Sequence, residues 1–377
     1  MLTSHIQSDS FLSALASNHP ALHKELSLAR MVRKNCPTMI FEEFKIYFDA
    51  LVDRLTDGIH YETGTKKAHN TAPQTLLSYL LSFASDIPKV LKKSDSASNG
   101  RLLLLESAYC ILDETRSKKF LTAVRQTVSE FAEKKSGPIH VIDAGCGAIP
   151  ILAIQAAITN PRVKVIALEF NQASCEMARQ IIESIGLKNQ IQVVEADATK
   201  YIPKVRPALI ISETMQAGFK EEPITKILKH LGQYLADDGK MIPSAAKIYA
   251  GVFQQAHKDR CPGQIYSGGM LIPTYFPSWE DHSKFDFIDS PDYFSLNFEL
   301  EVNPKDPGVV VVAAEIFLGS DKLELNESLI TMPVPVINIR DPQKIEPVRI
   351  SPESPKNKVI VMYPPGAAEP LGGVLCL

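Results

Sequence analysis

Residues 139–150 read IHVIDAGCGAIP, and this stretch decides the fold. The apolar run 139–142 is typical of a buried strand, and Gly145 and Gly147 follow it on either side of Cys146. Both glycines can adopt positive φ and allow a ligand to approach the backbone closely. Although an ordinary tight turn can carry the same glycines, a strand, a glycine turn and a helix together place backbone N–H groups beside a ligand. The stretch therefore predicts a nucleotide-binding turn.

Around this turn the sequence alternates between strand-like and helical runs. Such alternation favours a parallel sheet with helices on its faces, and short apolar strands fit burial on both sides. We therefore predict an α/β fold with a doubly wound, mostly parallel, Rossmann-like sheet. The strands are expected at 140–143, 164–168, 191–196 and 208–212, and the helices at 151–158, 172–186 and 222–236.

The chain has 377 residues, which favours two or three domains. Residues 1–98 are predicted to be a helical region, because 20–32, 41–55 and 72–91 have amphipathic helix spacing. Residues 99–243 are predicted to be the Rossmann-like domain, which begins with two consecutive helices over 101–135. From 244 to 377 the β-type runs and their proline-bearing turns predict a C-terminal β barrel or sandwich.

Composition narrows the class of partner. The formal net charge of -3 gives no reason to expect nucleic acid or an anionic membrane. The six cysteines are scattered without a CxxC pair, as expected for reduced thiols in a cytoplasmic protein. The N-terminus lacks the pattern of a secretory signal, and no apolar run reaches the length of a membrane span. Because His257 and His282 are isolated from acids at metal-ligand spacing, no metal site is expected.

Two carboxylates sharpen the expected ligand. Asp143 ends the first predicted strand, and Glu169 ends the second, where a carboxylate can bind both hydroxyls of a ribose. This arrangement suits NAD and S-adenosylmethionine alike. Pro150, however, stands where a dinucleotide-binding turn has the third glycine that allows close packing near a pyrophosphate. S-adenosylmethionine has no pyrophosphate, so we expect it as the cofactor and keep an NAD-dependent enzyme as a weaker alternative.

The same stretch resembles a known family. VIDAGCGAIPILAIQAA (141–157) looks like motif I of the class I S-adenosylmethionine-dependent methyltransferases, and VIALEFN (165–171) resembles their second motif. The resemblance implies cofactor binding by Asp143, Gly145, Gly147 and Glu169. It also implies that Asp197, in VVEADA after the third strand, or its neighbours contact the adenine.

A narrower resemblance lies over 106–252. ISETMQAGFKEEP (211–223) is similar to the double-glutamate loop of the protein arginine methyltransferases, which makes Glu213 and Glu222 the implied catalytic pair. LDETRS (112–117) resembles the segment whose arginine binds the methionine carboxylate of the cofactor, a role that would fall to Arg116. The β domain departs from the family: it has no Thr-His-Trp loop, and ITMPVPVINI (330–339) occupies the approximate place.

These residues predict methyl transfer to a cationic nitrogen. A guanidinium matches carboxylates through paired hydrogen bonds, and a glutamate can accept a proton as the new bond forms. Without the Thr-His-Trp loop, and with a near-neutral charge, we expect a small guanidino or amino compound such as free arginine. A protein arginine substrate and a non-catalytic cofactor-binding regulator remain alternatives. The helical region is expected to be a lid or a dimerisation arm, with a homodimer left open.

Overall fold

The computed structural model describes part of the chain, which forms two compact units that we treat separately. The boundaries between the units fall after Glu213, within 224–232 and after Ile242. The first unit contains the parallel sheet, and the second contains the antiparallel strands that follow it. The described residues are 41–55, 72–84, 110–217, 223–253, 264–267, 270–273, 281–286, 296–301, 309–325, 327–331, 334–338, 348–349 and 358–363.

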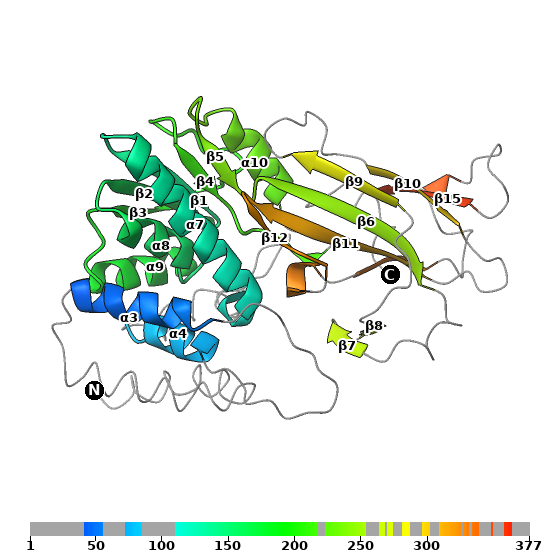
Figure 1. The fold of residues 1–377 in the computed structure, drawn as a ribbon, viewed down its shortest axis with the longest axis horizontal. Helices are drawn as coiled ribbons and strands as arrows, with labels where there is room; N and C mark the ends of the chain where they lie inside the picture. Colours follow the sequence, from blue (N-terminus) through cyan, green and yellow to red (C-terminus); the bar gives the residue numbers. More distant parts are fainter. Residues whose placement is uncertain are drawn as a thin grey trace. The chain divides into compact units, whose positions relative to one another are not determined.

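The first unit is built on a five-stranded sheet with the order β3-β2-β1-β4-β5. Every neighbouring pair is parallel, which confirms the predicted Rossmann-like sheet (Figure 1). The chain moves outward from β1 to β3 and then returns to the other side of β1, so the strand order reverses between β1 and β4. In open α/β sheets a ligand crevice lies at this reversal, outside the carboxyl ends of the strands. The strands are β1 (Ile139–Ala144), β2 (Val163–Glu169), β3 (Ile191–Glu195), β4 (Leu209–Ile211) and β5 (Lys240–Ile242).

Three helices pack against this sheet: α7 (Glu114–Lys134), α8 (Ile151–Thr159) and α9 (Gln172–Ser184). Helices α7 and α8 also pack against each other. Side-chain caps define where two of them begin. Asp113 accepts the Arg116 N–H at the start of α7, and Asn171 accepts the Ser174 N–H at the start of α9. Such caps satisfy N–H groups that the first helical turn leaves without partners.

Two elements differ from the sequence prediction. The helix predicted over 222–236 is α10 (Ile224–Gly232), which is shorter because a turn precedes β5. Strand β5 was not predicted, since its three residues, Lys-Met-Ile, are too few to show a strand pattern. It forms because Leu209 to Ile211 of β4 offer a parallel edge that pairs with it residue by residue.

The helices α3 (Phe41–Asp53) and α4 (Ala72–Leu81) also belong to the first unit. Their contact is aromatic: the rings of Phe44 and Tyr79 stack at 5.8 Å, and Phe83 meets Phe44 edge-on at 5.7 Å. The helix predicted over 72–91 ends earlier than expected, because a turn follows Leu81. The helix predicted over 20–32 lies outside the described residues.

After Pro243 the second unit contains antiparallel strands, as the β-type runs predicted. Its largest pairing joins β6 (Ala245–Phe253) to β11 (Val309–Leu318) along nine residue pairs. Among the described residues after Pro243, the helical structure is limited to the 3-10 turn η4 (Leu329–Thr331). The other strands are β7 (Gln264–Ser267), β8 (Met270–Pro273), β9 (Asp281–Asp286), β10 (Leu296–Glu301), β12 (Asp321–Leu323), β13 (Val334–Asn338), β14 (Val348–Arg349) and β15 (Lys358–Tyr363).

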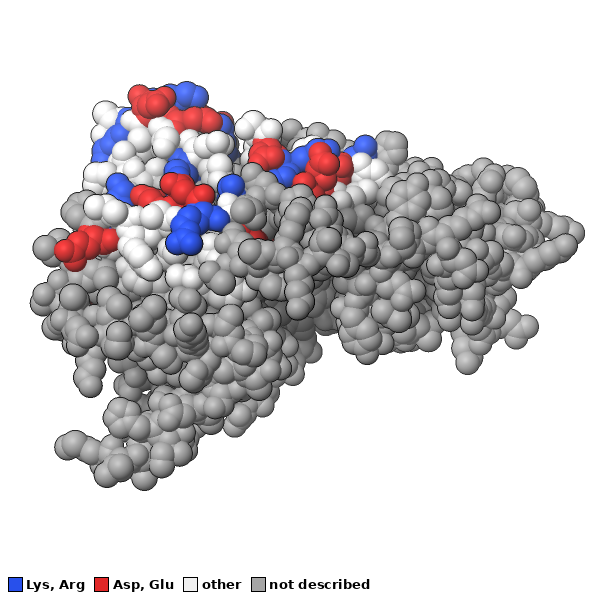
Figure 2. Space-filling view, turned by 60° about the horizontal axis from the view of Figure 1, so that its bottom comes forward, with Lys and Arg blue, Asp and Glu red and all other residues white. Residues whose placement is uncertain are grey.

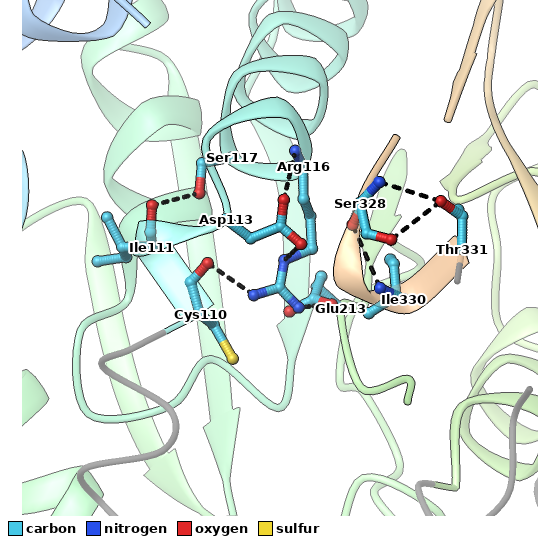
Figure 3. A network of polar contacts seen from close by, with 9 residues as sticks. All are labelled: Cys110, Ile111, Asp113, Arg116, Ser117, Glu213, Ser328, Ile330 and Thr331. Carbon is cyan, nitrogen blue, oxygen red and sulfur yellow. Dashed lines mark hydrogen bonds and ion pairs between the residues drawn. The ribbon is translucent and has the colours of Figure 1, made fainter. Parts of the chain in front are cut away.

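The turn η4 is stabilised by its own hydroxyl groups. Thr331 donates its Oγ1–H to the Ser328 carbonyl at 3.1 Å, and the same oxygen accepts the Ser328 N–H at 3.1 Å (Figure 3). Residues 330–339, the place of the missing Thr-His-Trp loop, therefore contain the end of η4 and strand β13. Closure of the antiparallel strands into a barrel or sandwich stays a prediction.

The described surface carries charges of both signs. Acidic and basic side chains lie interleaved on the face shown in Figure 2. Within the described parts of the chain, no helix combines the length and the apolar character that crossing a membrane requires. A search of the same residues finds no group of three or more His, Cys, Asp or Glu residues that could hold a metal ion.

Candidate active site

The glycine turn after β1 has the backbone conformation that its sequence predicts. Gly145 has a φ of 81° and Gly147 a φ of 66°, a region that residues with a Cβ rarely adopt. The N–H groups of Gly145 and Cys146 both donate to the Leu168 carbonyl at the end of β2, at 2.8 and 2.9 Å. These two amides bind the neighbouring strand, so they are not directed at a phosphate.

Glu169 closes the other side of this turn. Its Oε2 accepts the Gly147 N–H at 3.0 Å, and its Oε1 accepts the Asn171 N–H at 2.7 Å. Its backbone carbonyl accepts the Ala196 N–H at 2.9 Å, which ties the end of β3 to the same place. Backbone donors on both sides fix the orientation of this carboxylate at the carboxyl edge of the sheet.

Asp143 lies beneath the turn and anchors α8. Only 1% of the residue is exposed, and its Oδ2 accepts the Ala153 N–H in the first turn of the helix at 3.0 Å. Burial raises the pKa of Asp143 to about 7 against the effect of that hydrogen bond, and the charges of Glu169 and Glu213 raise it further. Burial likewise raises the pKa of the Cys146 thiol, as expected for a packed side chain rather than a nucleophile.

The strand register brings Glu213 beside this turn. Asp143 of β1 pairs with Ile211 of β4, and Glu213 follows Ile211 by the same two residues that separate Gly145 from Asp143. Ser212 fastens the two strand ends, because its hydroxyl donates to the Ala144 carbonyl at 2.9 Å. Gly145 and Glu213, which are 68 positions apart, therefore lie at equivalent positions past the ends of neighbouring strands, where the strand order reverses.

Arg116 forms an ion pair with Glu213. Its Nη1 lies 3.1 Å from Oε1 of Glu213, and the Arg116 side chain is only 7% exposed (Figure 3). Its Nη2 donates to the Cys110 carbonyl in η1 (Cys110–Leu112) at 2.6 Å. Burial alone would lower the pKa of Arg116, but the Glu213 carboxylate and its other neighbours raise it above its ordinary value. The guanidinium therefore stays charged, with N–H groups left for a further anion.

A second carboxylate, Asp113, faces the same guanidinium and was missed in the sequence analysis. Its Oδ2 lies 3.8 Å from Nε of Arg116, and its side chain is fully buried. The signal that could have found it is positional, because an aspartate directly before a helix is a common N-cap. The LDETRS stretch thus supplies both a buried guanidinium and a buried carboxyl group.

Burial, Arg116 and Asp113 have opposing effects on the pKa of Glu213. Burial raises the pKa of Glu213 to about 7, although the Arg116 guanidinium acts in the opposite direction, and the Asp113 charge adds to the rise. The Glu213 side chain keeps 16% exposure, so solvent reaches it on one side. A carboxyl group with these properties can exchange a proton near neutral pH.

The contacts of Asp197 lie within its own loop. Asp197 accepts both the hydroxyl and the N–H of Thr199, at 2.6 and 3.0 Å, and pairs with Lys200 at 3.5 Å. Burial would raise the pKa of Asp197, but these partners outweigh it and lower the pKa. Its contact with adenine stays a prediction. Glu222 lies outside the described residues, so its place in the site also stays a prediction.

The arrangement fits a nucleoside without phosphates. Glu169 offers a fixed carboxylate for ribose hydroxyls, and Arg116 offers a buried cation for a carboxylate. The turn amides that a pyrophosphate would use are bonded to Leu168 instead. Pro150 directly precedes α8, at its N-cap, rather than standing within its first turn. These features suit S-adenosylmethionine better than NAD.

Comparison with known proteins finds methyltransferases. The chain is 25% identical to catechol O-methyltransferase B of Danio rerio over 225 residues, which are 58% of this chain and 72% of that protein. It is 28% identical to an arginine N(omega)-methyltransferase of Streptomyces achromogenes over 148 residues, 37% of this chain and 38% of that protein. A scan against family models finds no match.

Among solved structures, the Trypanosoma brucei PRMT1 enzyme–prozyme heterotetrameric complex with AdoHcy matches 68% of this chain and 84% of that chain. The TM-score is 0.42 and the sequence identity 17%.

The strand order, the glycine turn bounded by Glu169, and the sequence similarity to two methyltransferases agree with one another. The chain is therefore an S-adenosylmethionine-dependent methyltransferase that resembles the class I enzymes and, among them, the arginine methyltransferases.

Proposed function

We propose that this methyltransferase N-methylates a guanidino or amino group of a small molecule, with free arginine as the reference compound. The observation that carries the proposal is the Glu213 carboxylate, which lies at the carboxyl end of β4 and pairs with Arg116 through one oxygen only. Among the described residues, Oε2 of Glu213 has no hydrogen-bond partner, which makes it the oxygen that can receive a second cation.

Each residue of the site has a distinct part in the proposal. Glu169 holds the ribose hydroxyls, and Arg116 holds the methionine carboxylate while it orients Glu213. Glu213, with Glu222 as its proposed partner, binds the acceptor nitrogen and takes its proton. When bound, S-adenosylmethionine supplies a methyl group on a sulfonium leaving group, so the protein mainly aligns the acceptor and excludes water. Alignment of two reactants can supply about 7–11 kcal/mol.

Two further parts of the chain enter the proposal. Residues 1–98 would form a lid over the acceptor or an arm for a homodimer, and 244–377 would close into a barrel or sandwich. Because α3 and α4 belong to the first unit, they limit which residues a truncation that tests the lid can remove. Removal of residues 1–98 would delete α3, which pairs with Arg125 of α7, so a truncation should stop before Phe41.

A second candidate is O-methylation of a small molecule. It is favoured by the similarity to a catechol O-methyltransferase, which extends over more of this chain than the similarity to the arginine enzyme. In that case Glu213 would accept a hydroxyl proton rather than bind a cation. A protein arginine substrate and a non-catalytic regulator are the remaining alternatives from the sequence.

The test is transfer of a labelled methyl group to a panel of free arginine, other guanidines, amines, catechols and arginine-containing peptides. We expect transfer to a guanidine or amine, and we expect Glu213→Gln to reduce kcat by about 100- to 10,000-fold with cofactor affinity nearly unchanged. Glu195→Gln, which alters an exposed acid at the end of β3, is the matched control. Transfer to catechols alone would favour the second candidate, and cofactor binding without transfer to any acceptor would favour a regulator.

A further inference from the structure

We propose that Asp113 is a positioning residue that keeps Arg116 from fully neutralising Glu213, and so leaves Glu213 able to accept a proton. The inference rests on the proposed role of Glu213 in methyl transfer. The Asp113 side chain is fully buried and lies near Nε of Arg116, whereas Glu213 contacts Nη1 of the same guanidinium. It is therefore expected to act through Arg116 rather than by contact with a substrate.

Asp113 lies at the N-terminus of α7. Its Oδ1 accepts the Arg116 N–H at 3.3 Å, so the carboxylate caps the first turn of α7. A negative charge at a helix N-terminus is stabilised by the unsatisfied N–H groups and the helix dipole. Because the side chain has no solvent exposure, water cannot screen this charge from its neighbours.

The site therefore holds two carboxylates and one guanidinium. Arg116 approaches Glu213 through Nη1 at 3.1 Å and Asp113 through Nε at 3.8 Å. Within the described part of the chain, the contacts of this cluster include no second cation: Cys110 of η1 offers its carbonyl to Arg116, and the charge of Glu213 acts on Asp143 of β1. Two negative charges beside one cation disfavour the ionisation of Glu213, although Glu213 has the closer contact with Arg116. Burial raises the pKa of Glu213 to about 7, the Arg116 charge acts against this rise, and the Asp113 charge adds to it.

Two substitutions separate the charge of Asp113 from its capping role. Asp113→Asn keeps a good N-cap and removes the charge, whereas Asp113→Glu keeps the charge and replaces the residue with a type not favoured at N-caps. Asp113→Ser is a second neutral cap in case the asparagine variant folds poorly. Asp238→Asn, which removes an acid with a 67% exposed side chain that pairs with Lys135 at 2.7 Å, is the matched control.

The primary measurement is the titration of Glu213 by NMR in the full chain labelled with ¹³C at glutamate carboxyls, with its signal assigned by loss in Glu213→Gln. We expect Asp113→Asn and Asp113→Ser to lower the pKa of Glu213 by roughly one pH unit, because a buried like charge is removed. Asp113→Glu should leave that pKa near the wild-type value even if the melting temperature falls. The acid limb of the kcat–pH profile should move with the NMR titration.

A titration of Glu213 that does not move in Asp113→Asn and Asp113→Ser would overturn the inference. The inference also fails if the titration moves with the melting temperature across all three variants, since that pattern indicates a structural cap only. The NMR titration needs no methyl acceptor. Failure to find an acceptor would thus count against the proposed function, while an unmoved titration would count against the role of Asp113.

Discussion

Helix α7 carries two arginines that each face two carboxylates, one at a buried site and one near the surface. Arg116 lies between Asp113 and Glu213 with 7% of its side chain exposed. Arg125, nine residues along the same helix, donates to Asp49 and Asp53 of α3 at 3.2 and 3.1 Å, and 35% of its side chain is exposed. The chemical groups and the shortest distances are nearly the same.

Burial separates the two arrangements. Around Arg125, water solvates both carboxylates, whose side chains are 33% and 65% exposed, and salt screens their attraction. Around Arg116, solvent is nearly absent, so each charge depends on its protein neighbours. The exposed cluster therefore joins two helices with little energy, whereas the buried cluster controls the charge of a site residue.

The largest effect is expected from removal of the buried cation. Arg116→Gln should lower the free energy of unfolding by about 3–5 kcal/mol, because Asp113 and Glu213 would lose the charge that compensates their burial. The same variant should bind S-adenosylmethionine more weakly. Urea unfolding and calorimetry measure the two effects. A loss below about 1 kcal/mol would show that burial does not distinguish this arginine from Arg125.

The next largest effect is expected at Glu169, a carboxylate that accepts hydrogen bonds from backbone N–H groups instead of pairing with an arginine. Glu169→Gln should weaken cofactor affinity by about 10- to 100-fold, since hydrogen bonds to a charged group contribute about 1.5–3 kcal/mol each. At saturating cofactor, kcat should change little, because Glu169 is not expected to contact the acceptor. Titration calorimetry with S-adenosylhomocysteine provides the measurement, with Glu195→Gln as the exposed control. Equal affinities in the two variants would contradict the assignment of Glu169.

A third test asks what burial does to an acid without a cationic partner. The pKa of Asp143 is about 7 in the folded chain, above its ordinary value of 3.8. Between pH 4 and 7 the folded protein thus retains a proton that the unfolded chain has lost, so the free energy of unfolding falls as pH rises through that window. The expected fall is on the order of 1–3 kcal/mol. Asp143→Asn should reduce this fall, with Glu213, whose pKa is also about 7, contributing the remainder, as measured by urea unfolding at pH 5 and pH 7.5. An identical slope in the variant would rule out Asp143 as its source.

The smallest effect should come from the exposed cluster. Arg125→Gln is expected to cost less than about 1 kcal/mol of stability, and its cost should shrink further at high salt. Methyl transfer should not change. Thermal unfolding at two salt concentrations tests both statements. A loss as large as that of Arg116→Gln would mean that the number of charge partners, and not burial, sets the strength of these clusters.

Local patterns were sufficient for much of the fold. The runs at 140–143 and 164–168 are strands within one residue of the predicted limits, because short apolar runs bounded by turns have few alternatives. The glycine turn was also predicted, because positions with positive φ favour glycine, and Gly145 and Gly147 both have positive φ. Strand β5 was not readable, because its three residues become a strand only through pairing with β4.

The sequence predicted which residues belong to the site, but not which of them contact one another. Arg116 was expected to bind the cofactor and Glu213 the acceptor, yet nothing in the sequence indicated that the two would pair or that Asp113 would share the arginine. Asp197 was expected at the adenine, and its described contacts are with Thr199 and Lys200. Such contacts depend on which side chains meet across strands and helices that are far apart in the sequence.

The amino-acid sequence by itself determined the glycine turn, the alternation of strands and helices, and the residue types available for chemistry, because these depend on local conformation and on periodic burial. Only the tertiary structure decided which charges are neighbours and how much water reaches them. The electrostatic energy of a pair depends on distance and on the surrounding dielectric, and both are set by packing. That is why Arg116 and Arg125, alike in sequence terms on one helix, have different expected roles.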